Sequence, residues 1–170
     1  RKIGGGWDET QSRSRYTLNE DHVTGSIFMS DHPKPEAIWM PGYPVHPNTT
    51  RRVAGMTYLD RSPQSDVQYY VDMFGSEPVH VSDERVMFTT PRGEFFELIK
   101  AETAAGLFPG VAPLNESHDI RGCGYTMEVE SLERCELVLR DGGVPCRKDG
   151  HTLFTEAPFG CGMAMAFIEA

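Results

Sequence analysis

The sequence has no cluster of basic residues and no long apolar segment. Its 16 lysines and arginines are outnumbered by 25 aspartates and glutamates, which gives a formal net charge of −9. This balance argues against a protein that binds the nucleic-acid backbone, which needs clustered positive charge, and against a polybasic membrane anchor. The apolar run at residues 162–168 is far shorter than the roughly 20 residues of a transmembrane helix. We therefore expect neither a nucleic-acid nor a membrane partner.

Closely spaced cysteine pairs and a targeting leader are lacking as well. The four cysteines, Cys123, Cys135, Cys146 and Cys161, include no CxxC motif. This spacing favours reduced thiols that pack as small hydrophobic side chains, with a disulfide or a metal cluster as the alternatives. The sequence begins at Arg1 without a charged-then-apolar leader, so we expect a cytoplasmic protein that is a fragment or a processed product.

What the sequence does contain is enough apolar material for a core and a weak internal repeat. The 170 residues are 39% hydrophobic, which suits one average domain or two small ones. Residues 55–58 (GMTY) align with residues 124–127 (GYTM), and at the same offset residues 95–101 (FFELIKA) align with residues 164–170 (AMAFIEA). A constant offset over this whole length indicates two copies of one unit.

Each copy has the pattern of a strand, a helix and three further strands. In the first copy we expect a strand over 53–59, a helix capped by Ser62 with Val67, Tyr70, Val71 and Phe74 on one face, and strands over 79–81, 85–90 and 94–100. In the second copy we expect a strand over 123–129, a helix capped by Ser131, and strands over 144–147, 151–156 and 163–169. The organisation is then residues 1–50 as a remnant strand and Pro-rich linker, 51–101 as module one, 102–119 as a linker and 120–170 as module two.

Strand alternation predicts which residues face away from the two helices. The bulky alternate positions of each strand should pack under the helices, and the opposite face then carries small or polar residues. We expect this second face to line a cavity rather than a tightly packed core. The predicted cavity-lining residues are Gly55, Thr57, Phe95, Gly124, Thr126, Glu128, Ala164 and Ala166.

Residues 50–170 resemble the vicinal oxygen chelate superfamily, which includes glyoxalases, bleomycin-resistance proteins and extradiol dioxygenases. The resemblance is carried by residues 53–60 (VAGMTYLD) before a capped helix, and by residues 94–100 (EFFELIK), 122–129 (GCGYTMEV) and 162–169 (GMAMAFIE). It implies an α+β fold in which two βαβββ modules form a curved mixed sheet, an open barrel with the helices outside. It also implies a divalent metal held by His or Glu side chains on the first and last strand of each module.

At the positions implied for metal ligands, this sequence departs from the superfamily. The first-strand positions are Gly55 and Gly124, and the last-strand positions are Glu97 and Ala166. One potential ligand of four remains, so we expect these two modules to be metal-free. Glu97 is then the candidate catalytic residue, as a general base or polar anchor in the cavity, and the alternative is a structural carboxylate that bonds a neighbouring arginine or a backbone N–H.

The first 50 residues fit neither copy. Residues 26–39 (SIFMSDHPKPEAIW) and 46–48 (HPN) resemble the middle of longer glyoxalase-like proteins, where they join an N-terminal module pair to a C-terminal one; Asp31 stands where Gln is usual and Thr49 where Gly is usual. The resemblance implies that residues 23–30 form the last strand of an earlier module. His32 then matches a metal ligand whose partners lie outside this sequence, whereas the alternative is a turn histidine before Pro33.

Taken together, the sequence predicts a glyoxalase-like protein of small-molecule metabolism. These two modules would be part of a larger metal-dependent lyase, isomerase or dioxygenase, whose metal the absent N-terminal modules would hold. The alternative is a metal-free module that binds a small molecule without chemistry, and a third possibility is a scaffold that only dimerises. The expected partners are a small-molecule ligand or substrate and either a second copy, since such modules expose strand edges, or the preceding modules.

Overall fold

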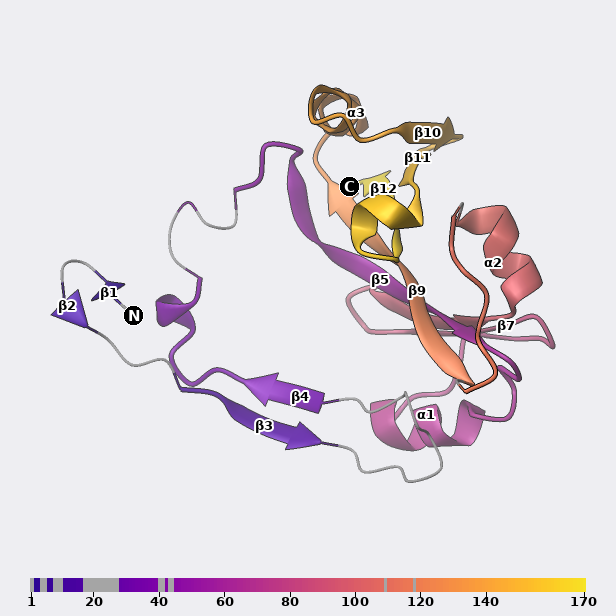
Figure 1. Cartoon of the computed structure of the whole chain (residues 1–170). Helices are drawn as coiled ribbons and strands as arrows, with labels where there is room; N and C mark the ends of the chain where they lie inside the picture. Colours follow the sequence, from indigo (N-terminus) through magenta and orange to yellow (C-terminus); the bar gives the residue numbers. More distant parts are fainter. Residues whose placement is uncertain are drawn as a thin grey trace.

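The computed structural model describes residues 2–3, 6–7, 11–16, 28–39, 42, 45–108, 110–117 and 119–170. Its centre is one eight-stranded mixed sheet in the order β10-β11-β12-β9-β5-β8-β7-β6 (Figure 1). The strands are β5 (Thr50–Asp60), β6 (His80–Val81), β7 (Arg85–Thr89), β8 (Phe95–Ile99), β9 (Ile120–Val129), β10 (Cys146–Asp149), β11 (Thr152–Thr155) and β12 (Ala164–Glu169). The helices are α1 (Val67–Phe74), α2 (Ala101–Leu107) and α3 (Leu132–Asp141), with a short 3-10 helix η2 (Ala157–Gly160).

The sheet is built from two copies of one unit, as the repeat predicts. In the first copy β5 is followed by α1 and by β6, β7 and β8, and β5 pairs with β8 in parallel. In the second copy β9 is followed by α3 and by β10, β11 and β12, and β9 pairs with β12 in parallel. The two copies join where β5 and β9 pair antiparallel at the middle of the sheet. The predicted α+β fold with an open mixed sheet of two βαβββ units is confirmed.

The outer face of the sheet is the face that α1 and α3 cover. On the first unit, Tyr70 of α1 packs with Leu98 and Phe96 of β8, and on the second, Cys135 of α3 packs with Phe167 of β12. These contacts confirm the strand alternation, because the bulky positions lie under the helices. Burial of this kind contributes about 25 cal/mol for each Å² of apolar surface removed from water.

The two outer helices begin differently. The prediction for α3 is confirmed, since the Ser131 side chain accepts a hydrogen bond from the backbone N–H of Arg134 at 3.2 Å. The predicted cap of α1 is wrong, because that helix begins at Val67 with Asp66 as its N-cap residue. The backbone N–H of Ser62 donates to Oδ1 of Asp60 at 2.7 Å, and Ser62 thereby belongs to a turn that precedes the helix.

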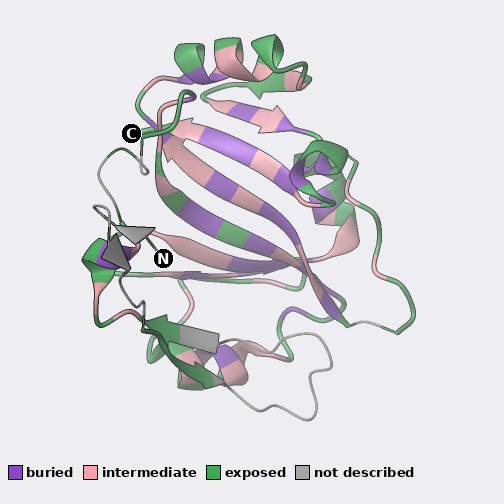
Figure 2. Ribbon diagram, turned by 60° about the vertical axis from the view of Figure 1, so that its left-hand side comes forward, coloured by how far each residue is buried: buried purple, intermediate pink, exposed green. Residues whose placement is uncertain are grey.

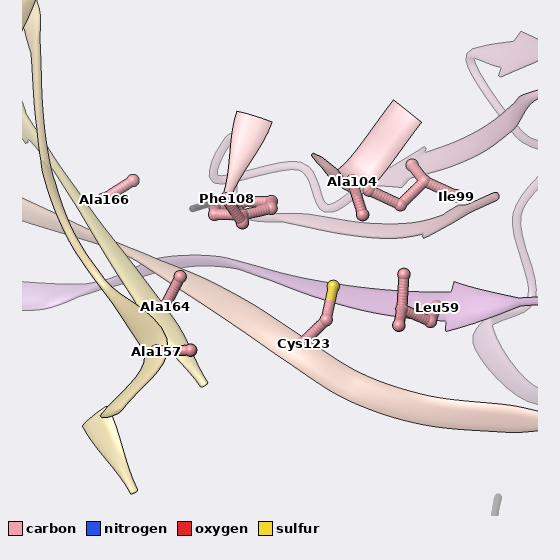
Figure 3. Close-up of a cluster of buried hydrophobic side chains, with 8 residues drawn as sticks. All are labelled: Leu59, Ile99, Ala104, Phe108, Cys123, Ala157, Ala164 and Ala166. Carbon is pink, nitrogen blue, oxygen red and sulfur yellow. The ribbon is translucent and has the colours of Figure 1, made fainter. Parts of the chain in front are cut away.

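The opposite, inner face of the sheet is covered by the segment that joins the two units. Sequence composition suggested only a linker over 102–119, but the structure has helix α2 there, followed by the buried ring of Phe108. Ala104 and Phe108 pack on Leu59 of β5, Cys123 of β9 and Ala164 of β12 (Figure 3). Figure 2 shows that the residues of the central strands are mostly buried or intermediate. The inner face therefore carries a hydrophobic core of its own.

The described residues before position 50 form small separate sheets. β1 (Lys2–Ile3) pairs with β2 (Gly6–Trp7), and β3 (Arg13–Tyr16) pairs antiparallel with β4 (Phe28–Asp31). The 3-10 helix η1 (Pro35–Ala37) follows β4. The strand predicted over 23–30 corresponds in part to β4, and residues 23–27 lie outside the described residues. None of the helices in the described residues is both long and apolar enough to cross a membrane.

Candidate functional site

The structure brings eight of the ten predicted site residues together in two neighbouring rows on the inner face, and Glu128 and His32 lie outside these rows. One row crosses the four central strands in register through Phe95, Gly55, Thr126 and Ala166. The other crosses the same strands through Glu97, Thr57, Gly124 and Ala164. The four positions that the superfamily resemblance assigns to metal ligands are Gly55, Glu97, Gly124 and Ala166, and they alternate between the rows.

Aromatic rings lie over both glycines of these rows. A Cβ placed on Gly55 would overlap the ring of Phe95, and a Cβ on Gly124 would lie 2.9 Å from Cε1 of Phe108. The missing side chains of both glycines thus point to the inner face, and ring carbons of Phe95 and Phe108 fill the space into which they would extend. Phe108 is only 4% exposed. No sequence signal identified Phe108, because it comes from the linker and meets Gly124 through tertiary packing.

Glu97 is buried and bonded to two side chains. The hydroxyl of Thr57 donates to Oε1 of Glu97 at 2.6 Å, and Nη2 of Arg85 lies 2.6 Å from Oε2. Glu97 is 3% exposed and Thr57 fully buried. These contacts correspond to the alternative interpretation of Glu97, a structural carboxylate that bonds a neighbouring arginine. The catalytic role predicted for Glu97 stays a prediction.

A second charged network lies on the same face, around Glu128, which is two residues beyond Thr126 on β9. Nη2 of Arg52 donates to Oε2 of Glu128 at 2.7 Å, and its Nη1 donates to Oε1 of Glu94 at 2.9 Å. The hydrogen bond from Arg52 holds the pKa of Glu128 below its usual value. The pKa of Glu94 is also lowered, first by a hydrogen bond from Thr90. Glu128 is therefore engaged with a cation that ties the two units together.

The thiol of Cys123 also lies on the inner face. It is fully buried and donates to the backbone oxygen of Thr57 at 3.4 Å. Burial raises its pKa to about 12, so the nucleophilic thiolate is suppressed at neutral pH. This environment indicates a packing role for Cys123, in agreement with the sequence prediction for the cysteines.

The side chains on the inner face do not fit a bound transition metal. Of the four positions implied as ligands only Glu97 has a donor group, and Thr57 and Arg85 already engage its oxygens. Metal sites of this class need several His or carboxylate ligands around open coordination positions. Within the described residues, no group of three or more His, Cys, Asp or Glu side chains could hold an ion.

His32, the predicted ligand for a metal outside these modules, directly follows β4. Its ring is partly exposed, and its Nδ1 is buried without a hydrogen-bond partner among the described residues. β4 pairs with β3 and belongs to a sheet separate from the eight-stranded one. The metal-binding role of His32 stays a prediction.

The turn at 46–49 has a left-handed backbone at Thr49, the position where the resemblance expects glycine. Thr49 has φ +64°, a left-handed conformation that glycine adopts at little cost. Its hydroxyl donates to the backbone oxygen of Ser131 at 3.3 Å and accepts from the Ser131 N–H at 3.2 Å. Asn48 is buried, and its Oδ1 contacts Nδ1 of His46 at 2.5 Å and accepts the N–H of Thr50 at 3.1 Å. Thr49 therefore has a backbone conformation that favours glycine, and its hydroxyl bonds the backbone of Ser131, the N-cap residue of α3.

Comparison with known proteins finds relatives by structure only. No protein-family model and no curated protein matches the sequence. Methylmalonyl-CoA epimerase from Mycobacterium tuberculosis superposes with a TM-score of 0.51 over 74% of this chain and 91% of that chain, at 15% identity. Methylmalonyl-CoA epimerase of Streptomyces coelicolor has a TM-score of 0.48 over 70% of this chain and 96% of that chain, at 12% identity. A hypothetical protein from Bacillus halodurans also has a TM-score of 0.48, over 70% of this chain and 94% of that chain, at 13% identity.

At identities this low, the similarity to these proteins concerns the fold alone. It agrees with the strand order and the two paired units described above. The superposition with the M. tuberculosis epimerase covers 74% of this chain. This share exceeds one βαβββ unit together with the first 50 residues and the linker, so it includes residues of both units. The chain therefore has the fold of the vicinal oxygen chelate superfamily.

Proposed function

We propose that this chain is a metal-free, non-catalytic module pair of a glyoxalase-like protein of small-molecule metabolism. The observation that carries the proposal is the state of the inner face, where the rings of Phe95 and Phe108 lie over Gly55 and Gly124. Glycines at two ligand positions remove the donor groups, and the rings fill the vacated space. A packed inner face of this kind supplies stability rather than open coordination positions.

On this proposal, lyase, isomerase or dioxygenase chemistry belongs to modules that precede the chain. His32 would be one of the ligands of their metal, since this residue directly follows the strand that the resemblance assigns to an earlier module. The two modules described above would act as their structural partner, within one protein or together with a second copy. The free cysteines are in keeping with a reducing compartment such as the cytoplasm.

The alternative, a module that sequesters a planar ligand on the inner face, receives less support from the geometry. Thr57, Thr126, Ala164 and Ala166 are all buried, and Phe108 with α2 packs on the same face. A ligand at these positions would have to displace Phe108 from a core in which it is 4% exposed. We therefore favour the structural partner over the sequestering module.

The test is a metal titration of the purified chain. Equilibrium dialysis against Co²⁺, Zn²⁺ and Mn²⁺, followed by elemental analysis, should give far less than one ion per chain. The proposal is wrong if one ion binds per chain and is lost in Glu97→Gln while it persists in Glu102→Gln. The second variant is the matched control, because Glu102 is exposed at the start of α2.

A further inference from the structure

A pocket of about 520 Å³ lies on the outer face of the sheet, beside α3. We refer to its lining residues Met127, Met165 and Phe167 as the floor. Leu139 of α3, Val53 of β5 and Trp39 line it as well. The floor belongs to the outer core of the second unit. The pocket is therefore on the opposite side of the sheet from the two rows of the candidate site.

The size and lining of this pocket suit a small molecule. Ligand pockets commonly have volumes of about 300–1,000 Å³, apolar walls and a few polar groups. Trp39 is 65% exposed and Val53 is 50% exposed, so two large apolar side chains of the same pocket are open to solvent. The two methionines can adapt their shape to a flat ring, because their side chains are unbranched and polarisable.

The charged groups of the lining are both cationic. Arg52 is held by Glu94 and Glu128, which leaves Arg51 as the adaptable cation. Nη2 of Arg51 lies 2.9 Å from Oε1 of Glu130, but the two side chains are 57% and 55% exposed. An ion pair so open to water is weak and readily exchanged. Arg51 can therefore turn to an anionic group of a ligand in the pocket.

We propose that this outer pocket binds a planar aromatic anion. Its ring system lies between the Trp39 indole and the methionine floor, and its carboxylate or sulfonate bonds the Arg51 guanidinium. The proposal does not rest on the proposed function, because Trp39, Arg51 and the two methionines do not belong to the two rows of the candidate site. Metal binding by the inner face would leave it untouched.

The test uses 8-anilinonaphthalene-1-sulfonate as the anionic probe and N-phenyl-1-naphthylamine as its neutral counterpart. The two tryptophans of the chain are Trp7 and Trp39, so a Trp7→Phe background makes the intrinsic emission a report on Trp39. We expect both probes to quench this emission on binding. Arg51→Gln should lower the affinity for the anionic probe about tenfold and leave the affinity for the neutral probe unchanged.

Two pocket variants and a matched control complete the design. Val53→Asp and Trp39→Ala, at exposed positions, should abolish binding of both probes, read from probe fluorescence, while near-UV circular dichroism shows a folded chain. Val79→Asp is the control, because Val79 is 60% exposed just before β6 at the far edge of the sheet.

Three outcomes would overturn the proposal. Equal loss of binding in Val53→Asp and Val79→Asp would mean that the probes bind the surface in general. If the Arg51→Gln variant binds both probes as tightly as the parent protein does, Arg51 does not recognise an anionic group of the ligand. Concentration-dependent dimerisation that Val53→Asp abolishes, without any probe binding, would make this face an interface between copies instead.

Discussion

Replacement of Gly124 by alanine should destabilise the protein, although alanine is the better residue in a strand. The new Cβ would lie 2.9 Å from Cε1 and 3.1 Å from Cδ1 and Cζ of Phe108. Ordinary van der Waals contact begins at 3.4 Å, so the ring or the strand must move by about half an ångström. Because Phe108 is buried between α2 and the sheet, overpacking should cost about 1–3 kcal/mol.

The gain from removing a glycine in a strand is about 0.5–1 kcal/mol. The net effect on the free energy of unfolding should therefore be a loss of up to about 2.5 kcal/mol, measured by urea denaturation. Phe108→Ala alone should cost about 3–5 kcal/mol. In the Phe108→Ala background the clash is gone, and Gly124→Ala should stabilise the protein by about 0.5–1 kcal/mol.

The sign of the Gly124→Ala effect thus depends on Phe108, and a double-mutant cycle measures the coupling. Gly106→Ala is the control, because a Cβ on this glycine of α2 meets nothing within 4 Å; it should stabilise the helix by about 1 kcal/mol in either background. Stabilisation by Gly124→Ala in the parent protein would refute the reasoning, because the space over Gly124 would then be open.

Three further predictions concern the turn, the helix cap and the charged network. Thr49→Val should lower the free energy of unfolding by about 1–2 kcal/mol, because it keeps the left-handed backbone and removes two hydrogen bonds, whereas Thr49→Gly should be near neutral in the same urea titration. Ser131→Ala should cost about 1 kcal/mol and Ser62→Ala less than about 0.5 kcal/mol; equal costs would contradict the assignment of the cap. The pKa of Glu128 is lower in the folded protein than in the unfolded chain. Its contribution to stability is therefore present at a pH above the pKa of the unfolded chain and is lost as the pH falls through the pKa of the folded protein. The urea midpoint should fall on acidification below about pH 4.5, and it should fall less steeply in Arg52→Gln.

The parts of the fold that follow from local pattern were predictable. The apolar spacing of α1, the cap of α3 and the alternation along β8 and β9 each rest on neighbours in sequence. The error at Ser62 has a local cause too: the Asp60 carboxylate, two residues earlier, captures the Ser62 N–H and forms a turn. A serine followed by proline is consistent with either structure.

The contacts that define the candidate site depend on tertiary structure. The Arg52–Glu128 pair depends on the register in which β5 pairs with β9. This register is shifted by irregularities between Thr50 and Arg52 and again near Gly55. A slip of one residue moves a side chain to the other face, so such a pair cannot be read from alternation alone. Phe108 meets Gly124 only because α2 crosses the sheet, and a segment rich in alanine and glycine gave no indication of that path.

The central claim is that the chain's own aromatic rings fill the inner face above the two glycines. Proton–proton nuclear Overhauser effects in a ¹³C-labelled sample test it directly. We predict cross-peaks from the ring protons of Phe108 to the Hα protons of Gly124, and from those of Phe95 to the Hα protons of Gly55. Their absence, together with cross-peaks from the Hα protons to water, would contradict the account.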